Sequence, residues 1–238
     1  MYMKRSASVV KWIKNRVRAA RARGCVVGLS GGVDSAVVAA LCKKAAGARL
    51  LCLIIPCGSS PDDMKDAAAV AKKFRLKTKI VDIKPVYRAF LKILPAGASL
   101  AASNLKPRLR MAALYYFANL HNFLVVGTGN KSEIAVGYFT KHGDGGADAL
   151  PLGSFYKSEV YALARELGVP RSVMEKPPSA GLWPGQTDEG EMGVTYEEIE
   201  RALRAAGRTG RIDNSKVAAM ARRSEHKRKP PEIYTEEK

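Results

Sequence analysis

The chain has 238 residues, of which 47% are hydrophobic and 26% are charged, and its formal net charge at pH 7 is +18. This length and hydrophobic content suffice for one sizeable globular domain. No apolar run reaches the ~18 residues of a membrane-spanning helix, and no apolar signal segment follows the basic N-terminus. We therefore predict a cytoplasmic protein that does not contact a membrane.

The positive charge allows more than one interpretation. Residues 1–24 carry eight Lys or Arg side chains and no acid. Such a chain could bind nucleic acid, but no recognised nucleic-acid-binding motif accompanies the charge. A positive field also suits polyanionic nucleotides, and surface charge can simply favour solubility. We expect no nucleic acid partner.

Four cysteines lie in or beside predicted core segments, at positions 25, 42, 52 and 57. They form no C-x-x-C pair, and the histidines come only later in the chain. We expect reduced, mostly buried thiols and no zinc site.

The first half of the chain alternates apolar runs with helical patterns. Residues 6–23 form an amphipathic pattern, which we expect to cap a sheet, although a targeting helix has the same pattern. Predicted strands are residues 25–29, 50–55, 78–81 and 123–127, and predicted helices are residues 34–46, 62–74 and 109–119. This order predicts an α/β fold with a doubly wound, Rossmann-like parallel sheet flanked by helices. The strands then end along one edge, which brings Ser30 and Gly127 together.

The second half contains a glycine-rich segment, residues 140–153, which we expect to be a long functional loop. A helix over residues 157–167 ends at Gly168. Residues 176–193 are rich in Pro, Gly and acids and are expected to be mobile. Extra C-terminal helices are predicted over residues 196–206 and 213–223.

The motif Ser30-Gly31-Gly32-Val33-Asp34-Ser35 lies between a predicted strand and a predicted helix. Its glycines let backbone N–H groups approach an anion, its hydroxyls add donors, and the helix dipole points at the same place. Asp34 is compatible with phosphate when Mg²⁺ bridges the two. The spacing differs from Walker A and resembles the pyrophosphate loop of ATP pyrophosphatases, which cleave ATP to AMP and pyrophosphate. The alternative is an ordinary glycine-rich turn.

Three further segments carry polar residues suited to a nucleotide site. Residues 103–111 place Pro107 in a predicted first turn of a helix, with arginines that suit phosphate or carboxylate, unless they form only a solvated face. Residues 127–133 follow a strand, so Thr128 is expected to touch the nucleotide and Glu133 to supply a second Mg²⁺ carboxylate. Residues 140–148 form a loop that is expected to order around a ligand. We interpret His142 there as a bystander rather than a general base.

The order of these motifs resembles that of the NAD synthetase family, the ammonia-using ligases of the ATP pyrophosphatase superfamily. The similarity extends from Ser30 to His226-Lys227-Arg228, and residues 140–148 are its most specific part. It implies a single domain over residues 1–238. In that domain residues 1–24 form the N-terminal helix, residues 25–170 the ATP pyrophosphatase core, and residues 171–238 the C-terminal loop, helices and tail.

The resemblance implies that ATP and ammonia convert deamido-NAD to NAD, AMP and pyrophosphate through an adenylated nicotinate carboxylate. It implies Mg²⁺ as cofactor, ATP as co-substrate and a homodimer that binds the dinucleotide across its interface. Only residues 1–24 precede the phosphate strand, which leaves no room there for a glutaminase domain. We therefore expect free ammonia, or ammonia delivered by a separate protein, as the nitrogen donor.

The resemblance also assigns residues to roles. Asp34 and Glu133 would hold Mg²⁺, while Asp144 and Lys157 would be catalytic, with Asp144 orienting ammonia. The expected ATP-binding residues are Gly28, Leu29, Ser30, Gly31, Gly32, Val33, Asp34, Ser35, Thr128, Lys157 and Ser179. The expected deamido-NAD-binding residues are Arg108, Lys141, Asp148, His226 and Lys227.

Two other interpretations remain open at this stage. A tRNA-modifying ATP pyrophosphatase that adenylates a nucleobase would share the phosphate loop and would use the positive charge. It would not account for residues 140–148, and no cysteine pair or RNA-binding appendage is present. A non-catalytic nucleotide-binding or nucleic-acid-binding protein is the other alternative, although each predicted metal and phosphate ligand position is intact.

Overall fold

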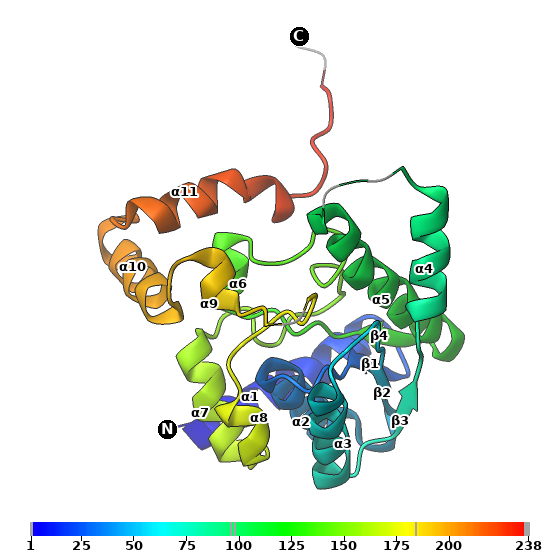
Figure 1. Cartoon of the computed structure of the whole chain (residues 1–238). Helices are drawn as coiled ribbons and strands as arrows, with labels where there is room; N and C mark the ends of the chain where they lie inside the picture. Colours follow the sequence, from blue (N-terminus) through cyan, green and yellow to red (C-terminus); the bar gives the residue numbers. More distant parts are fainter. Residues whose placement is uncertain (1, 96, 98, 184, 236–238) are drawn as a thin grey trace.

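The computed structural model describes residues 2–95, 97, 99–183 and 185–235. Its centre is a four-stranded parallel sheet in the order β3-β2-β1-β4 (Figure 1). The strands are β1 (Gly24–Gly28), β2 (Leu50–Ile54), β3 (Thr78–Ile80) and β4 (Phe123–Val125). The predicted doubly wound parallel sheet is confirmed. Because β1 and β4 are neighbours, the loops that follow them leave the same edge of the sheet.

Helices connect and cover these strands. The α-helices are α1 (Tyr2–Ala19), α2 (Val33–Ala46), α3 (Pro61–Phe74), α4 (Lys84–Ile93), α5 (Ser99–His121), α6 (Lys131–Val136), α7 (Lys157–Leu167), α8 (Arg171–Glu175), α9 (Asp188–Met192), α10 (Tyr196–Thr209) and α11 (Ser215–Arg223). Two short 3-10 helices are η1 (Gly47–Arg49) and η2 (Glu225–Lys227). None of the helices in the described part of the chain is long and apolar enough to cross a membrane.

Successive side chains of β1 and of β2 enter opposite hydrophobic cores, as the two-residue period of a strand requires. Val27 packs in a core with helices α2, α3 and α7, whereas its neighbour Val26 packs in a core with α5. Both valines are fully buried. This double burial explains why β1 and β2 are almost entirely apolar in sequence, whereas β3, at the edge of the sheet, is exposed.

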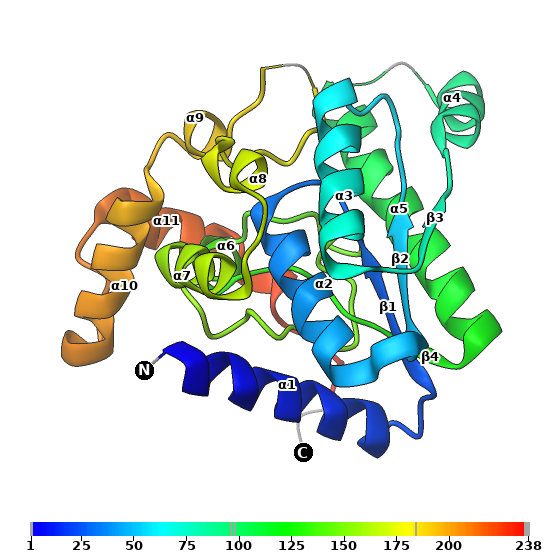
Figure 2. The ribbon, with the colours of Figure 1, turned by 90° about the horizontal axis from the view of Figure 1, so that it is seen from below.

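Helix α1 occupies a different place from the one expected. Val9 and Ile13 are buried in the core that includes α2 and α7, and Figure 2 shows α1 lying across α2. The helix therefore covers other helices, as a third layer, and not the sheet itself. The amphipathic pattern predicted a covering role but could not specify which surface is covered.

The start of α5 corrects a second expectation. The helix begins at Ser99, so Pro107 lies in its interior and Asn104, Arg108 and Arg110 are not at a helix N-terminus. An interior proline removes one helical hydrogen bond at a cost of about 3 kcal/mol. Pro107 is itself buried, and an added Cβ on Gly143 would lie 3.0 Å from its ring. Pro107 thus lies next to the loop at Gly143, within the otherwise continuous helix.

Sequence reasoning also missed several helices. Helix α6 begins at Lys131, shortly after β4 ends at Val125, and α9 lies inside the segment that was expected to be a mobile loop. Helices α6, α9, α10 and α11 share a third hydrophobic core, centred on Ile199 and Val217. In Figure 1, α10 and α11 lie on the opposite side of the molecule from β3 and α4. This third core fixes the C-terminal helices beside the segment that follows β4.

Candidate functional site

The phosphate loop, residues 30–35, is held in shape by its own hydroxyl groups. The Ser30 hydroxyl accepts a hydrogen bond from the Gly32 backbone N–H at 3.2 Å, and the Ser35 hydroxyl donates to the Gly32 carbonyl at 2.9 Å. Gly31 has a φ of +90°, and a Cβ there would lie 2.5 Å from the Asp63 carbonyl oxygen. Glycine is therefore required at this position by both conformation and space.

The loop leads directly into the N-terminus of α2. Gly32 is the N-cap residue, in an extended conformation, and no side chain caps the first turn. The N–H groups at the start of a helix carry a partial positive charge and need acceptors. The combination of an uncapped helix start and a glycine-rich loop suits an anionic ligand such as a phosphate.

Next to this loop, one buried ammonium joins two carboxylates. Lys157 Nζ lies 2.5 Å from Asp34 Oδ2 and 3.2 Å from Glu133 Oε1, and Lys157 is only 3% exposed. Asp34 comes from α2, Glu133 from the first turn of α6, and Lys157 from the start of α7. The structure thus brings together the two predicted metal ligands and the predicted catalytic lysine.

Asn130 fixes the geometry of this group. Its side-chain amide donates to Asp34 Oδ1 at 2.9 Å, while its side-chain oxygen caps α6 by accepting from the Glu133 N–H at 3.0 Å. In return, Glu133 accepts from the Asn130 backbone N–H at 3.1 Å. This reciprocal capping box is a local pattern that the sequence displays, although no role was predicted for Asn130.

Tyr196 and Asp188 complete the group and were missed by sequence reasoning. The Tyr196 hydroxyl lies 2.8 Å from Asp188 Oδ2 and 3.2 Å from Glu133 Oε1. The Lys157 ammonium lies 4.9 Å from the centre of the Tyr196 ring, within cation–π range. Asp188 is 4% exposed, and its second oxygen, Oδ1, has no hydrogen-bond partner among the described residues. No local sequence signal relates these residues to Glu133.

The charges in this group shift one another's titration. Burial raises the pKa of Glu133 to about 7; the positive charge of Lys157 opposes this shift, and the negative charge of Asp34 adds to it. Burial alone would lower the pKa of Lys157, but Asp34 and Glu133 raise it, so the lysine is charged near neutral pH. The group therefore holds a stable cation between two carboxylates.

These residues fit a magnesium ion that is shared with a nucleotide. Mg²⁺ is usually held by one or two protein carboxylates together with substrate phosphates and water. Asp34 and Glu133 already bind one cation, the Lys157 ammonium, and they lie beside the phosphate loop. Among the described residues, no cluster of three or more His, Cys, Asp or Glu is placed to hold a metal.

A second group surrounds residues 137–148, here called the glycine loop. The Arg108 Nε donates to the Lys141 carbonyl at 3.3 Å, and the Lys141 Nζ donates to the His226 carbonyl at 2.8 Å. Lys227 donates to two further carbonyls of the loop. Asp144 accepts from the Thr140 N–H at 2.9 Å. Four of the five predicted deamido-NAD-binding residues thus lie in one connected network.

The remaining predicted residues are placed differently. Asp148 uses both oxygens within the chain, accepting from the Tyr115 hydroxyl at 2.9 Å and from the Val125 N–H at 2.8 Å. Ser179 is exposed, and its hydroxyl accepts from the Gly181 N–H at 3.1 Å. Thr128 lies in the segment between β4 and α6. Because β4 pairs with β1, this segment leaves the same edge of the sheet as the phosphate loop. His142 is an exposed loop residue with a φ of +61°.

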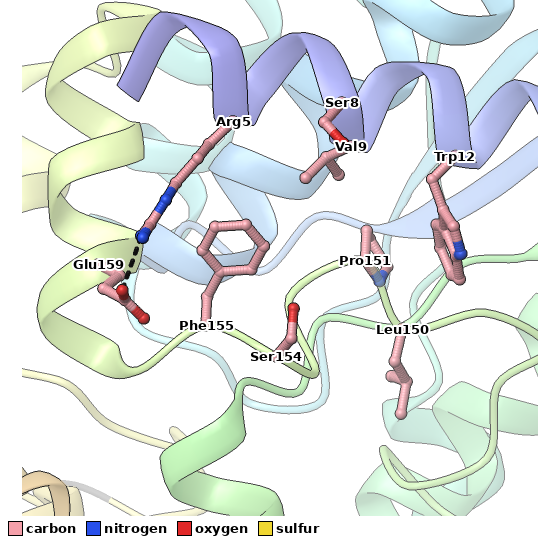
Figure 3. A pocket seen from close by; sticks show the side chains of 9 residues that line it. All are labelled: Arg5, Ser8, Val9, Trp12, Leu150, Pro151, Ser154, Phe155 and Glu159. Atoms are coloured by element: carbon pink, nitrogen blue, oxygen red, sulfur yellow. Dashed lines mark hydrogen bonds and ion pairs between the residues drawn. The ribbon is translucent and has the colours of Figure 1, made fainter. Parts of the chain in front are cut away.

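One cavity lies away from these residues. It has a volume of about 600 Å³ and lies between α1 and residues 150–159 (Figure 3). Trp12 and Phe155 line it, together with the ion pair between Arg5 and Glu159, whose charged atoms are 2.7 Å apart. None of the sequence-predicted site residues contributes to it. We therefore do not identify this cavity with the candidate active site.

Comparison with known proteins places this geometry in a family. The NAD synthase family model matches residues 6–231. The chain is 47% identical over 96% of both chains to the NH(3)-dependent NAD(+) synthetase of Carboxydothermus hydrogenoformans. Among solved structures, it superposes on an NMN synthetase from Francisella tularensis (TM-score 0.91, 40% identity, 98% of each chain). It also matches the NH3-dependent NAD synthetase of Campylobacter jejuni (TM-score 0.83, 32% identity, 99% of this chain and 100% of that one).

The raised pKa of Glu133 predicts a specific pH dependence of stability. The folded pKa lies above the unfolded value of 4.5, so between these values the folded state holds a proton that the unfolded state has lost. The free energy of unfolding should therefore fall as pH rises from about 4.5 to 7, by up to about 3 kcal/mol from this group. Urea titrations of the metal-free protein at several pH values measure this fall.

The matched variant is Glu133→Gln, which cannot titrate and should lose that part of the slope. Glu197→Gln, at an exposed position on α10, should retain the wild-type slope. If the unfolding free energies of wild type and Glu133→Gln ran parallel with pH, the carboxyl of Glu133 would not titrate in this range.

Proposed function

Because this chain belongs to the NAD synthase family, we propose that it uses ATP and ammonia to amidate deamido-NAD, giving NAD, AMP and pyrophosphate. The observation that supports this most directly is the group formed by Asp34, Glu133 and Lys157 beside a phosphate loop. This group is suited to ATP cleavage between the α- and β-phosphates. The glycine loop is suited to binding deamido-NAD, whose nicotinate carboxylate is adenylated.

The chemistry explains why such a group is needed. A carboxylate is a poor acylating agent, so the nicotinate carboxylate first attacks the α-phosphorus of ATP and displaces pyrophosphate. Ammonia then attacks the carbonyl carbon of the mixed anhydride, AMP leaves, and the nitrogen loses its extra proton. The first step develops negative charge on the departing pyrophosphate, which preorganised cations and N–H donors stabilise.

We assign these functions to the phosphate loop, α2 and Lys157. The loop N–H groups and the uncapped start of α2 would bind the β- and γ-phosphates. The Lys157 ammonium, charged at neutral pH, would stay beside them as pyrophosphate leaves. Asp34 and Glu133 would hold Mg²⁺, which neutralises phosphate charge when it is bound. Thr128 and Ser179 would complete the ATP site.

The glycine loop would bind the dinucleotide acid. Lys141 belongs to this loop, and Arg108, His226 and Lys227 contact it, so several positive charges gather in this region. Burial and the charges of Arg223 and Arg108 lower the pKa of Lys227, although Asp144 opposes this shift. We assign to Asp144 the role of orienting ammonia, and to Asp148 a supporting role in the wall of the site.

A second candidate acid follows from the structural comparison. The solved structure with a TM-score of 0.91 is an NMN synthetase, whose product is a mononucleotide amide. The same adenylation chemistry would act on nicotinate mononucleotide, because both acids carry the same nicotinate carboxylate. The phosphate loop does not distinguish them, whereas an adenylate-binding part of the acid site would.

One assay tests both candidates. With ATP, Mg²⁺ and ammonium, we expect NAD, AMP and pyrophosphate in equal amounts from deamido-NAD, with kcat/KM about tenfold or more above that for nicotinate mononucleotide. Glutamine should not replace ammonium. Turnover of the mononucleotide alone would identify the second candidate, and no AMP from either acid would contradict the proposed function.

The assignment of Asp34 to the metal predicts the effect of one substitution. Asp34→Asn keeps the shape of the side chain but removes its charge, so kcat/KM should fall on the order of 10²–10³-fold. Asp62→Asn, at an exposed position that pairs with Lys65, is the control and should change little. Removal of Mg²⁺ with EDTA should abolish turnover of the wild type. Near-normal turnover by Asp34→Asn would remove Asp34 from the metal site.

We further propose that the enzyme is a cytoplasmic homodimer. The free, buried state of all four cysteines agrees with a reducing compartment. Helix α4 buries none of its residues, and exposed apolar side chains of α4 and α5 include Ile93, Tyr116 and Leu120. A second copy of the chain would cover such a surface.

Sedimentation equilibrium measures this association. The expected mass is twice that of the 25.7 kDa chain, and Leu120→Asp, which places a charge on the exposed face of α5, should shift the protein towards one chain. A single 25.7 kDa species at all micromolar concentrations of the wild type would contradict the dimer.

A further inference from the structure

Three donors from three segments hold the Glu133 carboxylate. Its Oε2 accepts from the Asn130 backbone N–H at 3.1 Å, and its Oε1 lies 3.2 Å from both Lys157 Nζ and the Tyr196 hydroxyl. Asn130 caps α6, Lys157 begins α7, and Tyr196 begins α10. In the proposed reaction Lys157 is shared with the phosphates of ATP. The Tyr196 contact is therefore the one on Oε1 that does not depend on the nucleotide.

Tyr196 is itself held by α9. It is 6% exposed, its backbone N–H donates to Glu189 Oε1 at 2.8 Å, and its hydroxyl lies 2.8 Å from Asp188 Oδ2. It also packs in the third hydrophobic core, together with Met192 and Val194. The place of the hydroxyl is therefore set by the short helix α9 and by the packing of the C-terminal helices.

The Tyr196 hydroxyl has one proton and two carboxylate neighbours. Asp188 Oδ2 lies 2.8 Å from the hydroxyl oxygen, and Glu133 Oε1 lies 3.2 Å from it. The shorter contact is the stronger hydrogen bond, so Asp188 takes the larger share of the proton. Tyr196 thus limits the movement of the Glu133 carboxylate while Oε1 keeps a lone pair that a cation can use.

Asp188 is unfavourable for the stability of the fold. It is 4% exposed, and its Oδ1 has no hydrogen-bond partner in the part of the chain that the structure describes. Burying a charged group without full hydrogen bonding costs free energy, and burial accordingly raises the pKa of Asp188. Asparagine has the same shape and no charge. Stability alone therefore gives no reason for aspartate at this position, whereas a function of its other oxygen does.

We propose that Asp188 is a positioning residue: acting through the Tyr196 hydroxyl, it fixes the Glu133 carboxylate in the orientation that a divalent cation requires. This inference rests on the proposed function, because Glu133 is assigned to Mg²⁺ there. Replacing a residue that orients a metal ligand typically lowers metal affinity or activity by about 10–100-fold.

Binding of Mn²⁺, followed by electron paramagnetic resonance, measures this role without turnover. The whole protein is titrated with α,β-methylene-ATP present, in which carbon replaces the bridging oxygen whose bond to the α-phosphorus would break. In Asp188→Asn the Kd for Mn²⁺ should rise about tenfold or more, because the Tyr196 proton then turns to Glu133 and competes with the metal. Asp213→Asn, at an exposed position before α11, is the matched control and should leave the Kd unchanged.

The two residues should act along one path. Tyr196→Phe keeps the ring beside Lys157 and removes only the hydroxyl, so the Kd should again rise about tenfold. Adding Asp188→Asn to Tyr196→Phe should raise the Kd no further. A further rise would mean that Asp188 reaches the metal by itself and would overturn the proposal. A wild-type Kd in Asp188→Asn, or no Mn²⁺ binding by the wild type, would overturn it as well.

Urea unfolding separates positioning from support of the fold. Because asparagine removes a buried charge, the unfolding midpoint of metal-free Asp188→Asn should equal or exceed that of the wild type. A lower midpoint together with weaker Mn²⁺ binding would show that Asp188 supports the fold in general, and the proposal would be wrong.

Kinetics relate the result to the proposed function. With deamido-NAD, ATP and ammonium, the Mg²⁺ concentration that gives half the maximal rate should rise about tenfold or more in Asp188→Asn, and saturating Mg²⁺ should restore most of the rate. A loss of kcat that no Mg²⁺ concentration restores would overturn the positioning role. Absence of turnover in the wild type would contradict the proposed function and would leave the Mn²⁺ result standing.

Discussion

The buried ammonium of Lys157 is the interaction on which the candidate site depends. It ties α7 to α2 through Asp34 and to α6 through Glu133, so three elements from different parts of the chain share one charge. Removing one partner of a buried ion pair typically costs 3–5 kcal/mol, because the remaining charge lies unpaired in a poorly solvating environment. The same three charges that stabilise this packing are the ones to which we assign ATP cleavage. Stability and function therefore constrain the same residues.

The sequence predicted correctly those parts of the candidate site that follow from the order of strands in the sheet. Asp34 and Glu133 follow adjacent parallel strands, so their meeting at one edge follows from the strand order β3-β2-β1-β4. The sequence did not predict contacts that depend on packing between segments far apart in the chain. Tyr196 reaches Glu133 only because the third hydrophobic core holds the C-terminal helices beside α6, and no local pattern encodes that docking. The prediction that Pro107 lies in the first turn of a helix was wrong for a related reason. The local preference of proline for a helix start was overridden by tertiary contact, and Pro107 lies inside α5.

The basic residues around the glycine loop are held by backbone carbonyl groups. Lys141 and Lys227 donate to backbone carbonyls, and Arg108 does the same. A carbonyl oxygen orients a cation without cancelling its charge, whereas an ion pair with a carboxylate would neutralise it. The region therefore keeps a positive potential, which attracts phosphate groups and raises their rate of encounter. These side chains account for part of the net charge of +18.

The contact between Lys227 and Gly137 joins residues that are 90 positions apart in the sequence. Synthesis on the ribosome proceeds from the N-terminus, and long-range contacts form only after both partners have emerged. The sheet and the phosphate loop can therefore assemble while the glycine loop still lacks its contact with Lys227. A growing chain would thus form the proposed nucleotide-binding half first, and the proposed acid-binding half would be complete only after Lys227 has emerged.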